Sequence, residues 1–160
     1  NKLSGKTVFL IDVSGSMDSA VGGKSDLTRI DAACGLAMMG VGICEKAEVY
    51  TFSNNVAKVG LGAGTRGFAL ADAINKSQAH GGTELRKAIN AINQSATYDR
   101  IVVLTDEQSR DGNGQPLPDS KGYIINVAAH EHGVGYGNWT TVSGFSEAVL
   151  QYIQSLEAAD

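Results

Sequence analysis

The sequence predicts an α/β fold, with a doubly wound, mostly parallel sheet, helices on both faces and one antiparallel edge strand. Apolar segments of strand length alternate along the chain with longer segments of helical character, which favours a parallel sheet with crossover helices. Two of the apolar segments, at 6–13 and 100–105, are uninterrupted, as expected for central strands that are buried on both faces.

The first strand is followed by a loop and a long helix. The strand is Lys6–Val13, and a loop rich in Gly, Ser and Asp extends from Ser14 to about Asp26. Thr28 is the expected N-cap of the helix, and Asp31 completes a capping box. We expect this helix to end near Glu45. It contains three glycines, namely Gly35, Gly40 and Gly42, which disfavour a helix, so we expect its backbone to lie close to the sheet, where larger side chains would not fit.

The remaining elements follow in order. Ala47–Ser53 alternates as a strand does, and the turn signal Asn54-Asn55 predicts a hairpin partner at the sheet edge. Leu85, Ala88, Ile89 and Ile92 fall on one helical face. The expected segments are an edge strand at 56–60, helices at 68–77 and 84–95, strands at 100–105 and 123–128, a Gly-rich segment at 133–139 and a last helix at 145–156.

Composition excludes several classes of function. The chain has 160 residues, 42% of them hydrophobic and 19% charged, which fits one soluble domain over 1–160. Its net charge is -4 and no basic face is evident, so this domain alone is a poor candidate for nucleic-acid binding. No apolar run is long enough to span a membrane. The polar start at Asn1, without an initiator Met, predicts no signal peptide and a piece excised from a longer protein.

The two cysteines indicate a reducing compartment. Cys34 and Cys44 fall within the same predicted helix, so we expect them to be roughly 15 Å apart along its axis. A disulfide requires Cα atoms within about 7 Å. We therefore expect two reduced core thiols and a cytoplasmic location.

Three polar clusters lie at or beside the carboxyl ends of predicted strands, where ligands bind in open parallel α/β sheets. The first, Asp12-Val-Ser-Gly-Ser-Met17, closes the first strand. The second, Gly81-Gly-Thr83, precedes a helix, and the third, Thr105-Asp-Glu107, closes the next strand. We expect the three loops to bring together five oxygen donors, which are Asp12, Ser14, Ser16, Thr83 and Asp106.

These donors suit a hard divalent cation. Carboxylate and hydroxyl oxygens favour Mg²⁺, with Mn²⁺ or Ca²⁺ as alternatives, over a soft metal. If the hydroxyls bind directly, the ligands are largely neutral and the cation keeps most of its charge. Such a site attracts an external carboxylate or phosphate.

The pattern Asp12-x-Ser14-x-Ser16, together with Thr83 and Asp106, resembles the metal-ion-dependent adhesion site (MIDAS) of von Willebrand A domains, which have a Rossmann-like fold. The resemblance covers essentially the whole chain. A narrower resemblance, to the C-terminal domain of bacterial Ro-type (TROVE-family) ribonucleoproteins, is carried by the segments 80–84, 103–108, 125–128, 133–139 and 144–148.

These resemblances imply more than the residues do. They imply that Ser14, Ser16 and Thr83 contact the metal directly, with Asp12 and Asp106 largely bridged by water. They also imply that RNA binds a ring of helical repeats that is missing from this sequence. We therefore expect a non-enzymatic module whose partner is a protein or small anionic ligand with a carboxylate or phosphate, with no membrane contact.

Residues around the five donors have two open interpretations. His80, Gly15 and Gly82 are candidates for the rim of the site, although His80 is better explained as a plain surface histidine than as a residue that contacts a ligand. Glu107 either hydrogen-bonds to the site or is an exposed loop residue. Trp139 is expected to anchor the core.

Other functions fit the sequence less well. A haloacid-dehalogenase-type phosphotransferase needs a second Asp two residues after Asp12, where Ser14 stands, and a serine hydrolase needs a Gly before the Val13-Ser14-Gly15 segment. His130 and His132 do not share a face for zinc on a strand or a helix. The alternatives that remain are a metal-dependent phosphohydrolase at the same site and a chiefly structural domain that closes the RNA-binding ring.

Overall fold

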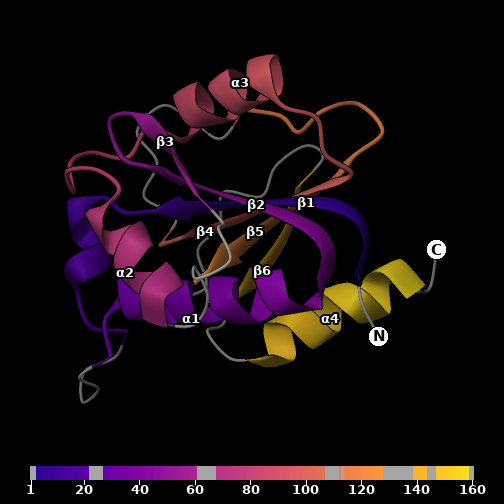
Figure 1. The fold of residues 1–160 in the computed structure, drawn as a ribbon, viewed down its shortest axis with the longest axis horizontal. Coiled ribbons are helices and arrows are strands. Elements are labelled where there is room, and N and C mark those ends of the chain that lie inside the picture. Colours follow the sequence, from indigo (N-terminus) through magenta and orange to yellow (C-terminus); the bar gives the residue numbers. More distant parts are fainter. Residues whose placement is uncertain are drawn as a thin grey trace.

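The computed structural model describes residues 3–21, 27–60, 68–106, 112, 114–127, 139–143 and 147–158. Figure 1 shows a central sheet with helices on both sides. The elements in chain order are β1 (Leu3–Asp12), the short 3-10 helix η1 (Gly15–Asp18), α1 (Arg29–Ile43), β2 (Cys44–Phe52), β3 (Val56–Val59), α2 (Phe68–Lys76), α3 (Leu85–Ser95), β4 (Arg100–Thr105), β5 (Lys121–Asn126), β6 (Trp139–Ser143) and α4 (Glu147–Ala158).

The described residues form a six-stranded sheet in the order β3-β2-β1-β4-β5-β6. All neighbouring strands are parallel except β3, which pairs antiparallel with β2 at the edge. The predicted fold class is therefore confirmed. After β1, the chain adds β2 and β3 on one side of β1 and then adds β4, β5 and β6 on the other side. The direction of the strand order therefore switches between β1 and β4. In open α/β sheets, ligand sites lie at the carboxyl ends of the strands at such a switch point.

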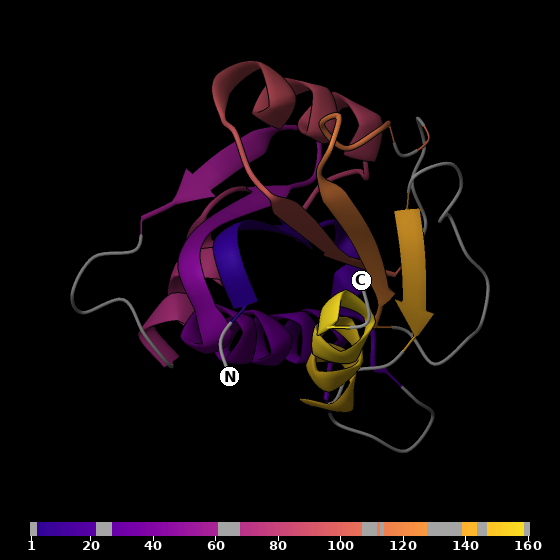
Figure 2. The same ribbon diagram turned by 90° about the vertical axis from the view of Figure 1, so that its right-hand side faces the viewer.

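The helices form two layers around the sheet. One core cluster joins α1, α2 and α4 to one face, and a second joins α3 to the other. Figures 1 and 2 both show α3 alone on its side. The face of α3 predicted to be apolar, Leu85, Ala88, Ile89 and Ile92, is fully buried, as its 3.6-residue period requires.

Most element boundaries lie within about three residues of the sequence-based expectation, and two differences change an interpretation. Helix α1 ends at Ile43, and Cys44 is the first residue of β2, so the prediction that both cysteines lie in one helix was wrong. Both thiols are nevertheless free and buried. Burial raises the pKa of Cys34 to about 12 and also raises that of Cys44, so both stay protonated and unreactive. The second difference is β6, which was not expected: its first residue, Trp139, ended the predicted Gly-rich segment, and the residues after it had no assignment.

Of the three α1 glycines, Gly40 meets the expectation of a close approach to the sheet. A Cβ on Gly40 would lie 2.5 Å from Cζ of Phe9, whose ring is buried in β1. Gly35 and Gly42 have open space at the same position. The predicted cap is also present, because Thr28 accepts a hydrogen bond from the Asp31 amide and the Asp31 carboxylate accepts one from the Thr28 amide. No helix among the described residues is both long and apolar enough for a membrane span.

Candidate metal centre

The candidate site lies at the carboxyl ends of β1 and β4, the two strands that flank the switch point. The parallel register places Ile11 beside Leu104, so Asp12 and Thr105 follow as neighbours at the ends of their strands. Asp106 comes directly after β4. Two carboxyl-bearing residues that are distant in the sequence are thus brought to one edge of the sheet.

Asp12 is fully buried and held at both oxygens. Its Oδ1 accepts a hydrogen bond from the Ser14 amide at 2.8 Å, and its Oδ2 accepts one from the Thr105 hydroxyl at 2.7 Å. Burial raises the pKa of Asp12 to about 6, against the lowering effect of the hydrogen bonds from Ser14 and Thr105, and the charge of Asp106 adds to the rise. Asp12 therefore fixes the conformation of the following loop, although its burial disfavours the ionised carboxylate.

The loop after β1 presents the two serine hydroxyls together. The Oγ atoms of Ser14 and Ser16 lie 3.3 Å apart, with Ser14 buried and Ser16 half-buried. The Gly15 amide between them donates to the Gly81 carbonyl at 2.9 Å. This backbone bond connects the first predicted cluster with the second.

The Gly-Gly-Thr loop is fixed by the β2–β3 turn. The Asn54 Oδ1 accepts a hydrogen bond from the Gly82 amide at 3.0 Å, and a Cβ on Gly81 would lie 2.5 Å from the Asn54 Nδ2. Only glycine allows this approach without displacing the Asn54 side chain. Thr83 follows and is buried, next to Glu84, whose amide bonds to the Ser53 carbonyl at 3.0 Å.

Asp106 carries the third cluster and is fully buried. Its Oδ2 accepts a hydrogen bond from Nη1 of Arg29 at 3.0 Å, and the same Nη1 lies 3.4 Å from the Ser16 carbonyl. The other oxygen, Oδ1, is buried without a hydrogen-bond partner. Because a buried, unsatisfied carboxylate oxygen is costly, a water or a bound ion next to this atom would stabilise it.

The outcome for the predicted residues is mixed. Contacts connect Asp12 with Ser14, Ser14 with Ser16, and Ser16 with Asp106 through Arg29, while Thr83 is placed near them only through its loop. Glu107 lies outside the described residues, as do His130 and His132.

His80 is not an isolated surface side chain. Its Nδ1 lies 3.3 Å from a carboxylate oxygen of Asp18, in η1, and its Nε2 lies 3.0 Å from the Asn75 carbonyl. The ring therefore ties the loop after β1 to the end of α2. Trp139 is buried in the core with its Nε1 donating to the Gly114 carbonyl, as expected.

The residues present fit a hard divalent cation. Within the described part of the chain, no three His, Cys, Asp or Glu side chains gather to hold a metal, so a cation here would depend on hydroxyl ligands. The adjacent Ser14 and Ser16 hydroxyls and the unpartnered Asp106 Oδ1 are oxygen donors of the kind that Mg²⁺ prefers. Two buried carboxylates also need positive charge nearby, which a cation would supply.

Sequence reasoning missed three residues that shape the site: Arg29, Asn54 and Thr105. Thr105 stood in a noted cluster without a role, and Asn54 was assigned only to a turn. The sequence did contain a signal for Arg29. A basic residue in the first turn of a helix interacts unfavourably with the helix dipole, so a negatively charged partner from outside the helix is expected.

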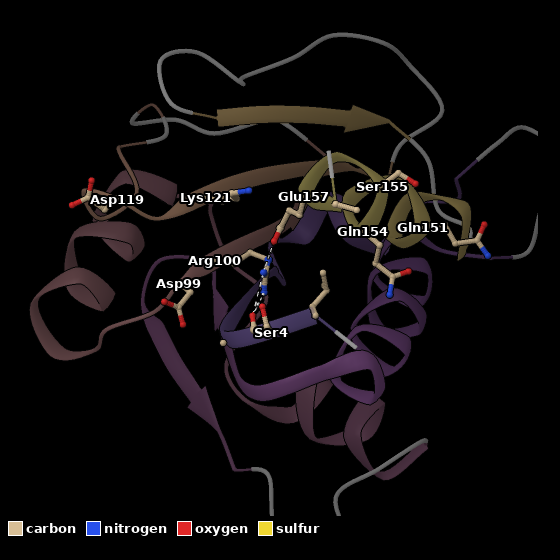
Figure 3. A pocket seen from close by; sticks show the side chains of 12 residues that line it. Ser4, Asp99, Arg100, Asp119, Lys121, Gln151, Gln154, Ser155 and Glu157 are labelled. Atoms are coloured by element: carbon tan, nitrogen blue, oxygen red, sulfur yellow. Dashed lines mark hydrogen bonds and ion pairs between the residues drawn. The ribbon is translucent and has the colours of Figure 1, made fainter. Parts of the chain in front are cut away.

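A polar cavity of about 1020 Å³ lies elsewhere, at the starts of β1, β4 and β5 and against α4. Figure 3 shows Arg100 reaching from its floor to Glu157 of α4 and to Ser4. The Arg100 guanidinium also donates to Thr7 at 2.7 Å, and Tyr123 donates to Glu157 at 2.9 Å. This network leaves no donor of Arg100 unused, so we assign it to holding α4 on the sheet.

Comparisons with known proteins agree with the fold. The sequence pattern of the family described as Ro60 vWA domain matches residues 6–123. No curated protein sequence matches the chain. The crystal structure of the Ro (Rsr) protein of Deinococcus radiodurans is similar over 94% of this chain and 34% of that one, with a TM-score of 0.73 and 22% identity. This chain thus spans about a third of that protein.

Two other solved structures share the fold at lower identity. An aerotolerance-related membrane protein of Bacteroides fragilis, with multiple mutations to serine, matches 76% of this chain and 66% of its own, with a TM-score of 0.58 and 19% identity. The conserved hypothetical protein BatB of Bacteroides thetaiotaomicron matches 96% and 97%, with a TM-score of 0.64 and 14% identity. At these identities the likeness shows the fold and not the ligand.

Proposed function

Because this chain belongs to the Ro60 vWA domain family, we propose that it is a metal-dependent binding module that captures an acidic group of a partner. The site would comprise Ser14, Ser16 and Thr83 as hydroxyl ligands, with Asp12 and Asp106 behind them. Mg²⁺ is the proposed cation, and Mn²⁺ would use the same donors.

The observation that carries this proposal is the unpartnered Oδ1 of Asp106. Native proteins pair almost all buried polar atoms, and those left over are often explained by an ion or a water. Here the leftover oxygen lies in the same contact network as the two adjacent serine hydroxyls. A bound cation would satisfy this oxygen, which supports the proposal.

The chain's own residues have separable tasks. Asp12 uses both oxygens on Ser14 and Thr105, so it sets the shape of the loop that carries the serines. Asn54 and Gly81 set the position of the Thr83 loop. When bound, a divalent cation would supply an open coordination position for a carboxylate or phosphate oxygen.

We propose no catalytic activity and a cytoplasmic setting. If the chain is part of a longer Ro-type protein, we propose that RNA is contacted by other parts of that protein, in keeping with the acidic charge of -4 here. The partner of this domain would then be a protein or a small anion.

Metal binding is tested by titrating Mn²⁺ into the protein and measuring free Mn²⁺ by electron paramagnetic resonance. We expect one site, with affinity lowered at least tenfold in Ser14→Ala. Ser95→Ala is the matched control, because Ser95 lies at the end of α3 and bonds only within its own helix. Absence of Mn²⁺ and Mg²⁺ binding, or equal binding by Ser14→Ala, would refute the proposal.

The enzymatic alternative has a different outcome. Incubation with p-nitrophenyl phosphate and Mg²⁺ should give no turnover above a chelator control. Turnover that disappears in Asp12→Asn would assign the site to a metal-dependent phosphohydrolase instead.

A further inference from the structure

Arg29 is a cation in direct contact with the candidate metal centre, and none of the predicted ligands accounts for it. Its Nη1 is bonded to Asp106 and lies near the Ser16 carbonyl. The Arg29 side chain is 17% exposed and that of Asp106 is 0% exposed, so water screens this ion pair only weakly.

The placement of Arg29 opposes local stability. It is the first residue of α1, directly after the N-cap, where the positive end of the helix dipole disfavours a cation. A guanidinium usually grips a buried carboxylate with two parallel hydrogen bonds, as Arg100 does with Glu157. Arg29 takes only one oxygen of Asp106 and leaves both its own Nε and the Asp106 Oδ1 buried without partners. The pair is therefore incomplete in itself.

We propose that Arg29 is the fixed counter-charge of the metal centre and determines its preference for anionic ligands. This inference rests on the proposed function. Asp12 and Asp106 together carry two negative charges, which a divalent cation alone would cancel, leaving a neutral site. With the permanent positive charge of Arg29, the loaded site keeps one net positive charge in a poorly screened position. Such a site favours a carboxylate or phosphate over a neutral carbonyl or hydroxyl ligand.

The proposal predicts effects of opposite sign on two affinities. Removal of the Arg29 charge removes its repulsion of the incoming cation, so the metal binds more tightly. The same change removes attraction for the anion, so the loaded site binds an anion more weakly. A residue that merely supported the fold would weaken both.

The test uses Mn²⁺ alone and then acetate as the anionic probe, at low ionic strength so that screening does not hide the effect. Mn²⁺ affinity is measured by electron paramagnetic resonance. Acetate binding is measured by the fall in water-proton relaxation as it displaces water from the bound Mn²⁺. In Arg29→Gln we expect Mn²⁺ affinity to rise about threefold or more and acetate affinity to fall about tenfold, which corresponds to about 1.4 kcal/mol.

Two further variants separate charge from structure. Lys76→Gln removes the same charge from a pair with 76% and 60% exposed side chains and should change neither affinity by more than about twofold. Arg29→Lys keeps the charge while losing the guanidinium, and both affinities should stay within about threefold of wild type, which also covers the case that Arg29→Gln does not fold.

The outcomes distinguish this inference from the proposed function. If the wild type binds Mn²⁺ and Arg29→Gln changes both affinities in the same direction, or neither, the role of Arg29 is refuted while the metal site stands. A large loss of either affinity in Arg29→Lys also refutes it. If the wild type binds no divalent cation, the proposed function falls and this inference with it.

Discussion

Replacement of Asp12 by Asn should stabilise the metal-free domain at neutral pH, although Asp12 is central to the candidate site. Burial raises the pKa of Asp12 from 3.8 to about 6. A carboxyl with a raised pKa contributes stability that is fully present below its unfolded pKa and is lost as pH rises through the folded value. With about 1.4 kcal/mol for each pKa unit, ionised Asp12 costs the metal-free fold about 2 to 3 kcal/mol above pH 7.

The asparagine side chain of the Asp12→Asn variant would avoid this cost without losing the contacts of Asp12. It has the shape of Asp, its oxygen can accept from the Ser14 amide, and the Thr105 hydroxyl can turn to accept from its NH₂ group. Urea unfolding in chelator should therefore show Asp12→Asn more stable than wild type by about 2 to 3 kcal/mol at pH 7.5, with the difference vanishing near pH 4.

Added cation should reverse the order. At a Mg²⁺ concentration one thousand times its Kd, binding adds about 4.1 kcal/mol to the wild type and little to the variant, which exceeds the advantage of about 2 to 3 kcal/mol that the variant has in chelator. Asp72→Asn, at an exposed position on α2, is the control and should keep the wild-type pH profile. An Asp12→Asn protein that is less stable than wild type at pH 7.5 in chelator, or a difference independent of pH, would refute the reasoning.

The other predictions concern packing and the opposite end of the sheet. Gly40→Ala should lower the free energy of unfolding by about 1 to 3 kcal/mol, because its Cβ meets the Phe9 ring, whereas Gly42→Ala should raise it by about 0.5 to 1 kcal/mol; both are read from urea unfolding. Glu157→Gln should lower the free energy of unfolding by about 3 kcal/mol, because it leaves Arg100 as a buried unpaired charge. Burial opposes ionisation of Glu157, but the hydrogen bonds from Arg100 hold its pKa below the ordinary value. The stability that ionised Glu157 contributes is therefore lost only as pH falls through that lowered pKa. Thermal melts should show a lower Tm for Glu157→Gln than for the wild type at pH 5, and the two Tm values should converge in stronger acid. The two cysteines should resist alkylation by iodoacetamide in the folded protein and react in urea, as mass spectrometry would show, and fast labelling of the native state would contradict their burial.

Sequence patterns predicted the fold because hydrophobic period and turn residues agree with the tertiary structure over most of the chain. The apolar face of α3 and the Asn54-Asn55 turn are local signals, and local signals decided those elements. The end of α1 was misplaced because Ile43 passes directly into β2 at Cys44 with no Gly or Pro between them. Pairing with β1, which no local pattern reveals, ends the helix there.

Strand β6 was missed for a related reason. Its residues include Trp139 and Val142, which suit a strand, but they follow a run of glycines that predicts a loop. The strand is defined by its parallel pairing with β5 and by the packing of the Trp139 ring over Gly122, where a Cβ would lie 2.8 Å from the ring. Both are contacts between segments distant in sequence.

The neighbouring positions of Asp12 and Asp106 could be predicted because parallel strands end at a common edge of the sheet. Arg29 could not be placed in this way, since its contact with Asp106 joins residues 77 apart through the side chain of a helix terminus. The sequence did show that Arg29 is a cation at the start of a predicted helix, where the helix dipole disfavours positive charge. Conflicts between local preference and global fold are expected to concentrate at functional sites.

The described part of this domain contains two largely buried Arg–carboxylate pairs, which differ in how completely their polar atoms are hydrogen-bonded. At the starts of the strands, Arg100 distributes all its donors over Glu157, Thr7 and the Ser4 carbonyl. That pair has nothing left to offer a ligand, and its role is to secure α4. At the carboxyl ends, the Arg29–Asp106 pair is buried more deeply at its carboxylate but leaves a donor and an acceptor unused. Burial of charge is common to both pairs and therefore does not distinguish them, whereas the unused atoms at the switch point support the proposed site. Since leaving such atoms unpaired lowers stability, a group that completes them at the switch point of the sheet, such as a water or the proposed cation, would stabilise the domain.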